Sequence, residues 1–162
     1  VYSAKNVVRV HVNVKILIVG DGPIKKQLTQ SLLAAKLLDN FIFVNRVEED
    51  VLPTLYNCAD VFVLPSIQEG QGIVLLEAQA SGIPVVAFEI GGVNEAVQNG
   101  RTGLLVDKGN CKGLAEALLK LLGDEVLRER MGLAGRKFVS ENYTWDLCAQ
   151  RMLKVYKGAL VN

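Results

Sequence analysis

The sequence predicts an α/β fold: a Rossmann-like parallel sheet flanked by helices, followed by a three-helix tail. Two observations carry this prediction. Short apolar runs alternate with segments of helical spacing through the first two thirds of the chain, and their connections are short. From about residue 110 onward the pattern is helical only. With 162 residues, the chain is long enough for one domain with its own core, and we expect residues 1–162 to form a single domain.

The predicted strands are continuous apolar runs, as in parallel sheets that are buried on both faces. They lie at residues 15–19, 41–44, 61–64, 84–88 and 103–106. Residues 1–14 differ, because Val8, Val10, Val12 and Val14 alternate with polar residues. This alternation predicts a half-exposed, irregular edge strand, on which His11 faces solvent and has no nearby partner for a metal or a catalytic role.

The predicted helices follow the strands and have recognisable ends. They lie at about residues 24–37, 51–58, 72–81, 93–98, 110–122 and 125–141, with a last one after residue 144. Asn110, Asp124 and Thr144 are good N-terminal caps for the three tail helices, and Gly82 suits the end of the helix before it.

Composition excludes several classes of protein. Half of the residues are hydrophobic and the formal net charge is +1, so neither disorder nor binding to nucleic acid is favoured. No apolar run approaches the roughly 20 residues of a membrane span, and no signal peptide is recognisable. Cys58, Cys111 and Cys148 are far apart, which predicts buried, reduced thiols in a cytoplasmic protein and no zinc site.

Three glycine-containing turns each follow a predicted strand. They are Gly20–Gly22, Gly70–Gly72 and Gly91–Gly92. The carboxyl ends of parallel strands meet at one edge of the sheet, where ligands of such folds bind. The three turns are therefore expected to converge on a ligand site.

The chemistry of that site is suggested by the stretch from Glu69 to Glu77. A helix begins near Gly72, and its free N–H groups and dipole favour an anion such as a diphosphate. Glu69 would be repelled by that anion, so it would accept hydrogen bonds from sugar hydroxyls or backbone amides. Glu77 can accept hydrogen bonds from both hydroxyls of a ribose. A nucleotide-diphosphate sugar fits these features. From spacing alone, a plain tight turn with one capping and one solvated glutamate remains the alternative.

Other common sites are disfavoured by missing motifs. Gly20-Asp21-Gly22-Pro23 lacks the third glycine of the dinucleotide-binding fingerprint. The sequence has no Gly-Lys-Ser/Thr of a P-loop and no nucleophile elbow. Binding of NAD, a P-loop mechanism and a hydrolase triad are therefore not expected.

Several stretches together resemble one known family. They are residues 15–23, 59–66, 69–78, 82–87, 91–95 and 99–106. In order and spacing, over roughly residues 13–160, they resemble the donor-nucleotide half of the retaining group 1, or family-four, glycosyltransferases. These enzymes have two facing Rossmann-like domains, the GT-B arrangement, and this chain is similar to the C-terminal one.

The resemblance implies a role for each site residue. Glu77 would bind the ribose, and Glu69, the one candidate catalytic residue, would contact the donor sugar or order the loop near the reacting carbon. The amides of Gly72, Ile73 and Val74 would hold the diphosphate. The other donor-binding positions are Gly20, Val47 beside the nucleobase with Glu49 nearby, Gly70 and Gln71.

The implied reaction is transfer of a sugar from a UDP-, GDP- or ADP-sugar to an acceptor hydroxyl, with retained anomeric configuration. Neither a cofactor nor a metal is implied, because the helix dipole and basic side chains would neutralise the leaving diphosphate.

The sequence departs from the family at three points. Gln71 stands where the family usually has Phe. Residues 1–14 are too few for the three elements with which the family's domain begins: a strand, a loop that carries an Arg and a Lys, and a helix. We expect the helix to be missing. Lys5 and Arg9 are then only weak candidates for a ligand of the phosphates. The N-terminal acceptor domain is expected to be missing as well.

From these departures we expect a chain that is inactive alone, whose exposed edge or interdomain face could drive self-association. Peripheral contact with a membrane would come only through the absent half. The alternatives are a stand-alone nucleotide or nucleotide-sugar binding module and half of a nucleotide-sugar epimerase-like protein.

Overall fold

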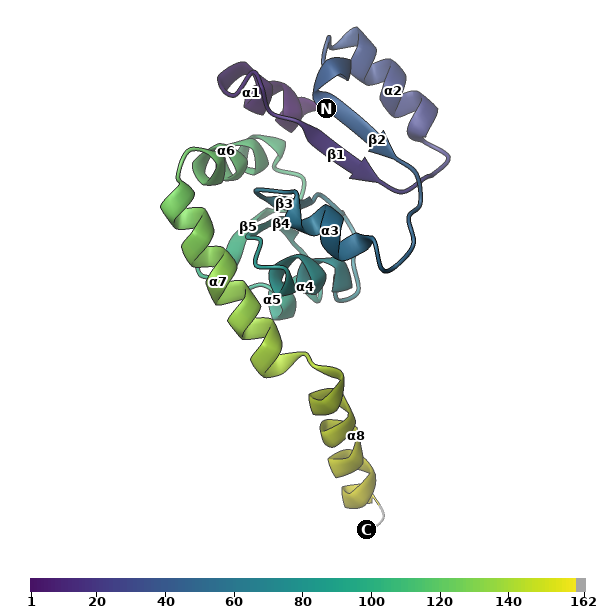
Figure 1. The fold of residues 1–162 in the computed structure, drawn as a ribbon, viewed down its shortest axis with the longest axis vertical. Helices are drawn as coiled ribbons and strands as arrows, with labels where there is room; N and C mark the ends of the chain where they lie inside the picture. The colour runs from purple at the N-terminus through teal and green to yellow at the C-terminus, as the bar shows by residue number, and fades with distance from the viewer. Residues whose placement is uncertain (160–162) are drawn as a thin grey trace.

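The computed structural model describes residues 1–159, which form an α/β fold of parallel strands and flanking helices (Figure 1). In chain order the elements are α1 (Tyr2–Val10), β1 (Ile16–Val19), α2 (Lys25–Ala34), η1 (Leu38–Asn40, a 3-10 helix), β2 (Phe41–Val44), α3 (Leu52–Asn57), β3 (Phe62–Leu64), α4 (Ile73–Ala80), β4 (Val85–Glu89), α5 (Val93–Ala96), β5 (Gly103–Asp107), α6 (Cys111–Leu122), α7 (Glu125–Asn142) and α8 (Trp145–Ala159). The predicted fold class and three-helix tail are confirmed. The predicted domain and resemblance extend beyond residue 159, into residues outside the described part.

The strands pair in parallel, but in two separate groups. β1 pairs with β2, from Ile16 opposite Phe41 to Val19 opposite Val44. β4 lies between β3 and β5. Within residues 1–159 no pairing joins β1 to β3, so the single sheet expected from the sequence is interrupted at this point.

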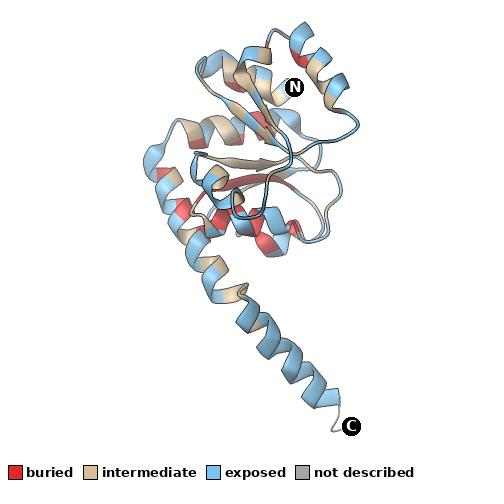
Figure 2. Ribbon diagram, turned by 45° about the vertical axis from the view of Figure 1, so that its right-hand side comes forward, coloured by how far each residue is buried: buried red, intermediate tan, exposed pale blue. Residues whose placement is uncertain are grey.

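The core of the protein surrounds β4. Val85 and Ala87 pack with α4 and α5 on one face, and Val86 and Phe88 pack with α6 and the start of α7 on the other. Alternate side chains of a strand point to opposite faces, so an unbroken apolar run fills both layers. By contrast, none of the residues of β1 or β2 is fully buried (Figure 2).

The first fourteen residues correct the sequence prediction. Residues 2–10 form the helix α1, not an edge strand, and the helix that we expected to be missing is present. Val7 is buried, and α1 packs against α6, where the Ser3 hydroxyl donates a 2.8 Å hydrogen bond to the Cys111 carbonyl. Ala4, Val7 and Val8 share one helical face, so packing on α6 outweighs the strand preference of the valines. His11 follows as the residue at the end of this helix.

The predicted caps of the tail helices are confirmed. Asn110 accepts from the Gly113 amide at 2.9 Å, Asp124 from the Leu127 amide at 2.9 Å, and Thr144 from the Leu147 amide at 3.3 Å. Gly82, the residue after the C-cap Ser81 of α4, has the left-handed φ of 80° that favours glycine there.

The tail ends in a helix that leaves the body of the molecule. α8 projects away from the sheets (Figure 1), and none of its described residues is buried. No helix in the described part of the chain is long and apolar enough to cross a membrane.

The prediction that the three cysteines are buried is wrong. Cys58, Cys111 and Cys148 are exposed free thiols. The first two stand at helix ends, after α3 and at the start of α6, and Cys148 lies on α8, so their apolar sequence neighbours do not enclose them.

Candidate functional site

The helix α4 begins at Gly72, a position that only glycine suits. Gly72 has a left-handed φ of 72°, and a Cβ there would lie 2.9 Å from Leu75 Cδ1. Ile73 and Val74 follow in the first turn, where amides have no acceptor within the helix, and both residues are exposed (63% and 37%). This geometry leaves donors available to an anion at the position that the sequence predicts.

Two of the three glycine turns meet. The Gly92 amide donates a 3.0 Å hydrogen bond to the Gly70 carbonyl, and a Cβ on Gly92 would overlap the same oxygen. A Cβ on Gly91 would lie 2.8 Å from the Glu69 carbonyl. Because β3 and β4 are paired neighbours, the loops after them are held together. The close approach requires glycine at positions 91 and 92, whereas a Cβ on Gly70 would have nothing within 4 Å.

The third turn, after β1, is tied to β2. The Gly20 amide donates to the Val44 carbonyl at 2.9 Å, and the Gly22 amide donates to the Asp21 carboxylate at 2.9 Å. Lys25 donates to the Asn45 side chain at 2.8 Å and lies 3.7 Å from Asp21. Among the described residues no hydrogen bond or ion pair links this turn to the Gly70 loop.

Glu77 has a partner that sequence reasoning missed. The Tyr56 hydroxyl of α3 donates a 2.8 Å hydrogen bond to Glu77 Oε2. The Tyr56 ring packs against Phe62 with ring centroids 5.6 Å apart. Burial first, and then the hydrogen bond to Glu77, raise the pKa of the Tyr56 phenol above its ordinary value. No local sequence pattern relates Tyr56 to a residue of α4.

Glu77 is exposed and lies one helical turn after Ile73, so both residues share a face of α4. An anion at the first turn and hydroxyl groups near Glu77 would therefore lie along the same side of the helix. The hydrogen bond from Tyr56 fixes the direction of the carboxylate and leaves lone pairs free to accept from a ligand.

The remaining predicted residues lie in two loops and on α1. Glu69 is half-buried, whereas Gly70 and Gln71 are exposed. Val47 is half-buried in the loop between β2 and α3. The weaker candidates Lys5 and Arg9 are exposed on α1 and belong to a helix, not to a phosphate-binding loop. In the described chain no three His, Cys, Asp or Glu side chains gather into a metal site.

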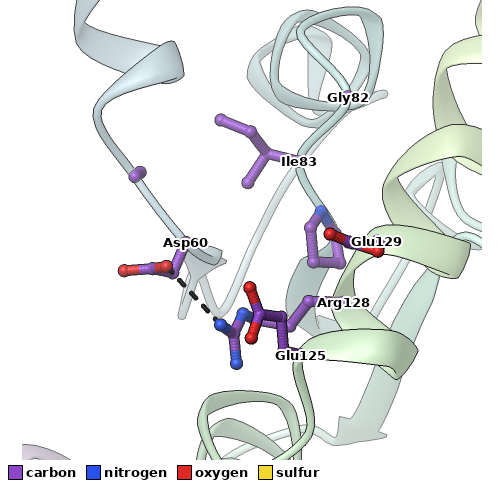
Figure 3. A pocket seen from close by; sticks show the side chains of 8 residues that line it. Asp60, Gly82, Ile83, Glu125, Arg128 and Glu129 are labelled. Carbon is purple, nitrogen blue, oxygen red and sulfur yellow. Dashed lines mark ion pairs between the residues drawn. The ribbon is translucent and has the colours of Figure 1, made fainter.

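One hollow lies away from the candidate site. It measures about 200 Å³ and is lined by residues that precede β3 and β4 and by the start of α7 (Figure 3). Arg128 reaches Asp60 at 3.8 Å across it and donates to the carbonyls of Leu121 and Leu122 at 2.8 and 3.0 Å. These contacts tie the end of α6 to the amino ends of the strands, so the hollow is a structural junction and lies opposite the glycine turns.

A second hollow, of about 310 Å³, lies between α7 and the loop before β5. Gln98 lines it, and its buried Oε1 atom has no hydrogen-bond partner within residues 1–159. None of the predicted donor residues lines either hollow. The candidate site consists of the loop at residues 69–72 and the start of α4, where Gly70, Gln71, Ile73 and Val74 are exposed.

Residues 2–138 match the family described as "Glycosyl transferases group 1". The chain belongs to this family. It is 37% identical over 150 residues to the GDP-mannose-dependent alpha-(1-6)-phosphatidylinositol monomannoside mannosyltransferase of Mycobacterium tuberculosis, a match that covers 88% of this chain and 39% of that protein. It is 34% identical over 161 residues to the capsular polysaccharide biosynthesis glycosyltransferase CapM of Staphylococcus aureus, covering 99% of this chain and 42% of that one. The group 1 chain thus spans about two fifths of the length of these curated relatives.

Several solved structures show the same fold. Sucrose-phosphate synthase from Thermosynechococcus elongatus superposes on 99% of this chain and 43% of its own, with a TM-score of 0.85 and 28% identity. A point mutant of S. aureus TarM, solved in complex with UDP, superposes on 95% of this chain and 31% of its own, with a TM-score of 0.88 and 26% identity. The C-terminal domain of the group 1 protein LpcC from Francisella tularensis gives a TM-score of 0.81 at 26% identity, over 89% of this chain and 77% of that domain. The chain therefore corresponds to a C-terminal GT-B half.

Proposed function

We propose that this chain is the donor-binding half of a retaining glycosyltransferase, and that it binds a nucleotide-diphosphate sugar at residues 69–77. The observation that carries the proposal is the start of α4, where the first-turn residues Ile73 and Val74 are exposed after a left-handed Gly72 and where Glu77, one turn further along, is oriented by Tyr56. An anion and a pair of hydroxyls can be recognised there at once, which is the chemistry of a nucleoside diphosphate.

In this proposal each residue has one role. The amides of Gly72, Ile73 and Val74 bind the diphosphate, and Glu77 accepts from the ribose hydroxyls. Gly70 and Gly20 leave room for the ligand beside the backbone, Gln71 and Glu69 face the donor sugar, and Val47 packs beside the nucleobase. Two relatives support a donor of this kind: one is named as GDP-mannose-dependent, and another was solved with UDP.

The proposal assigns acceptor binding to a second domain that completes the cleft, so the 162-residue chain should bind its donor without transferring the sugar. Titration calorimetry with UDP, GDP and ADP tests donor binding directly. Heat with one of the three would support the site, and no heat at millimolar ligand would contradict it. Hydrolysis or transfer by the chain alone would overturn the assignment of an inactive half.

Glu77→Ala tests the ribose assignment. It removes charged hydrogen bonds, so binding of the nucleoside diphosphate should weaken by about 1–3 kcal/mol. Glu116→Ala is the matched control, because Glu116 is an exposed helical glutamate whose only ion pair in the described chain is with Lys112 at 3.7 Å. Equal affinities for the Glu77→Ala variant and the unmodified chain would refute the role of Glu77.

A further inference from the structure

The two glutamates of the candidate site differ in how firmly their carboxylates are held. Glu77 Oε2 accepts a 2.8 Å hydrogen bond from the Tyr56 hydroxyl. Among residues 1–159 the Glu69 carboxylate takes part in no hydrogen bond or ion pair. The last torsion of a glutamate side chain is broad, so a carboxylate without a partner can turn in its plane. Only the Glu77 carboxylate is therefore oriented before a ligand binds.

The donor of this hydrogen bond is itself held in place. The ring of Tyr56 packs against Phe62, with ring centroids 5.6 Å apart, and borders the apolar cluster on one face of β4. A tyrosine side chain has only two torsions, so the packing of its ring also sets the position of its hydroxyl. α3, which carries Tyr56, lies beside α4, which carries Glu77 (Figure 1). The core of the protein thus restrains an exposed carboxylate through a single hydroxyl group.

An oriented carboxylate favours two adjacent hydroxyls over one. The Tyr56 hydroxyl uses one acceptor position of Oε2 and leaves Oε1 and a second lone pair of Oε2 for a ligand. The two hydroxyls of a ribose can both donate only if these acceptors lie in the right plane at the same time. A single hydroxyl can be met by a carboxylate that turns to it. Fixing the plane in advance removes a cost of binding that the pair of hydroxyls would otherwise meet.

A second tyrosine shows the same arrangement outside the candidate site. The Tyr143 hydroxyl donates a 2.7 Å hydrogen bond to the Glu95 carbonyl, and its ring packs against Phe138 with centroids 5.5 Å apart. Tyr143 borders the same apolar cluster as Tyr56. Its acceptor is a backbone carbonyl, whereas the acceptor of Tyr56 is a side chain of the candidate site. Loss of the Tyr143 hydroxyl is therefore a matched control for loss of the Tyr56 hydroxyl.

We propose that Tyr56 is a positioning residue that makes Glu77 selective for a ribose, so that the preference of the site for two adjacent hydroxyls depends on the Tyr56 hydroxyl. This inference rests on the proposed function, the binding of a nucleoside diphosphate at residues 69–77, and adds the selectivity of that binding. Tyr56 acts here through Glu77 and has no direct contact with the ligand.

The test compares each nucleoside diphosphate with its 2′-deoxy form by titration calorimetry, with UDP, GDP and ADP as the three parent compounds. The unmodified chain should bind the ribose form about tenfold or more tightly than the deoxy form, because a hydrogen bond to a charged group is lost with the hydroxyl. In Tyr56→Phe this ratio of affinities should fall at least about threefold. Tyr143→Phe should keep the ratio of the unmodified chain.

A double-mutant cycle shows whether Tyr56 acts through Glu77. In a Glu77→Ala background the further change Tyr56→Phe should leave the ratio of affinities unaltered, since no carboxylate remains to be oriented. A ratio that falls again in this background would overturn the proposal.

A Tyr56→Phe chain that binds both forms more weakly but with an unchanged ratio would also overturn it, because Tyr56 would then be only structural. An equal fall of the ratio in Tyr143→Phe would do the same, since a general loosening of the core would explain both. These outcomes leave the proposed function standing. If the unmodified chain binds none of the six compounds, or binds both forms equally, the proposed role of Glu77 fails and this inference fails with it.

Discussion

The two sheets of this protein are built from equally apolar strands, yet only the central strand of the second sheet, β4, is almost fully buried. β1 and β2 read Ile-Leu-Ile-Val and Phe-Ile-Phe-Val, and none of their residues is fully buried, whereas four of the five residues of β4 are. β4 has a strand on each side and helices on both faces. In the described part of the chain β1 pairs with a strand on one side only. Burial in this fold is therefore decided by how many neighbours a strand has, and not by its own hydrophobicity.

Alanine substitutions in the glycine turns should give the largest difference in stability between the two sheets. In Gly92→Ala the added Cβ would overlap the Gly70 carbonyl and force the two loops apart, so the free energy of unfolding should fall by about 3 kcal/mol. Gly22→Ala is the matched control in the turn after β1, where a Cβ would have nothing within 4 Å, and it should change stability by no more than about 0.5 kcal/mol. Urea unfolding followed by circular dichroism measures both. A Gly92→Ala chain as stable as its control would show that the two loops do not restrain each other.

Truncation of one valine in each sheet gives the next largest difference. Val86 in β4 is 0% exposed, and Val86→Ala should cost about 2 kcal/mol, because two buried methyl groups and their contacts are lost. Val19 in β1 is 39% exposed, and Val19→Ala should cost less than about 1 kcal/mol. The same urea titration compares them. Equal costs would mean that β1 is buried in solution by something that covers its edge.

Tyr56→Phe should have a small effect on the free energy of unfolding at neutral pH, about 1 kcal/mol for the lost hydrogen bond to Glu77. Its signature is the pH dependence. The pKa of Tyr56 is raised in the folded state, so its stabilising contribution is complete below the ordinary tyrosine pKa of about 10 and is lost as the pH rises above it.

Between about pH 9 and 11 the Tyr56→Phe chain should therefore lose less stability than the unmodified chain. Tyr143, whose pKa is also raised, chiefly by burial, remains in both chains and contributes the same slope. If the free energy of unfolding had the same pH dependence in both chains, the hydrogen bond between Tyr56 and Glu77 would be contradicted.

The sequence predicts most of what local pattern controls. The five strands and the three tail helices with their caps follow from apolar runs, helical spacing and residues such as Asn110 and Asp124. The prediction for residues 2–10 was wrong because the four alternating valines indicate a strand. The helix α1 is stabilised by its packing against α6, which no local pattern shows. The break in the sheet depends on pairing between distant segments, which no local pattern records.

The candidate site divides in the same way. Gly72 at the start of α4 and the two glutamates are recognisable from spacing, because a helix start and its acidic neighbours are local features. The Tyr56–Glu77 hydrogen bond and the contact between Gly70 and Gly92 join different elements and appear only in three dimensions. The individual roles of Val47, Gln71 and Glu69 stay predictions.

The single tryptophan of the chain, Trp145, lies at the start of α8 and is 91% exposed. Its fluorescence will therefore report almost nothing about the melting of the core, since the indole is already in water in the folded state. The same property makes it a sensitive optical probe of the projecting helix. A blue shift or quenching of its emission on addition of another polypeptide would signal contact along α8, without any label being introduced.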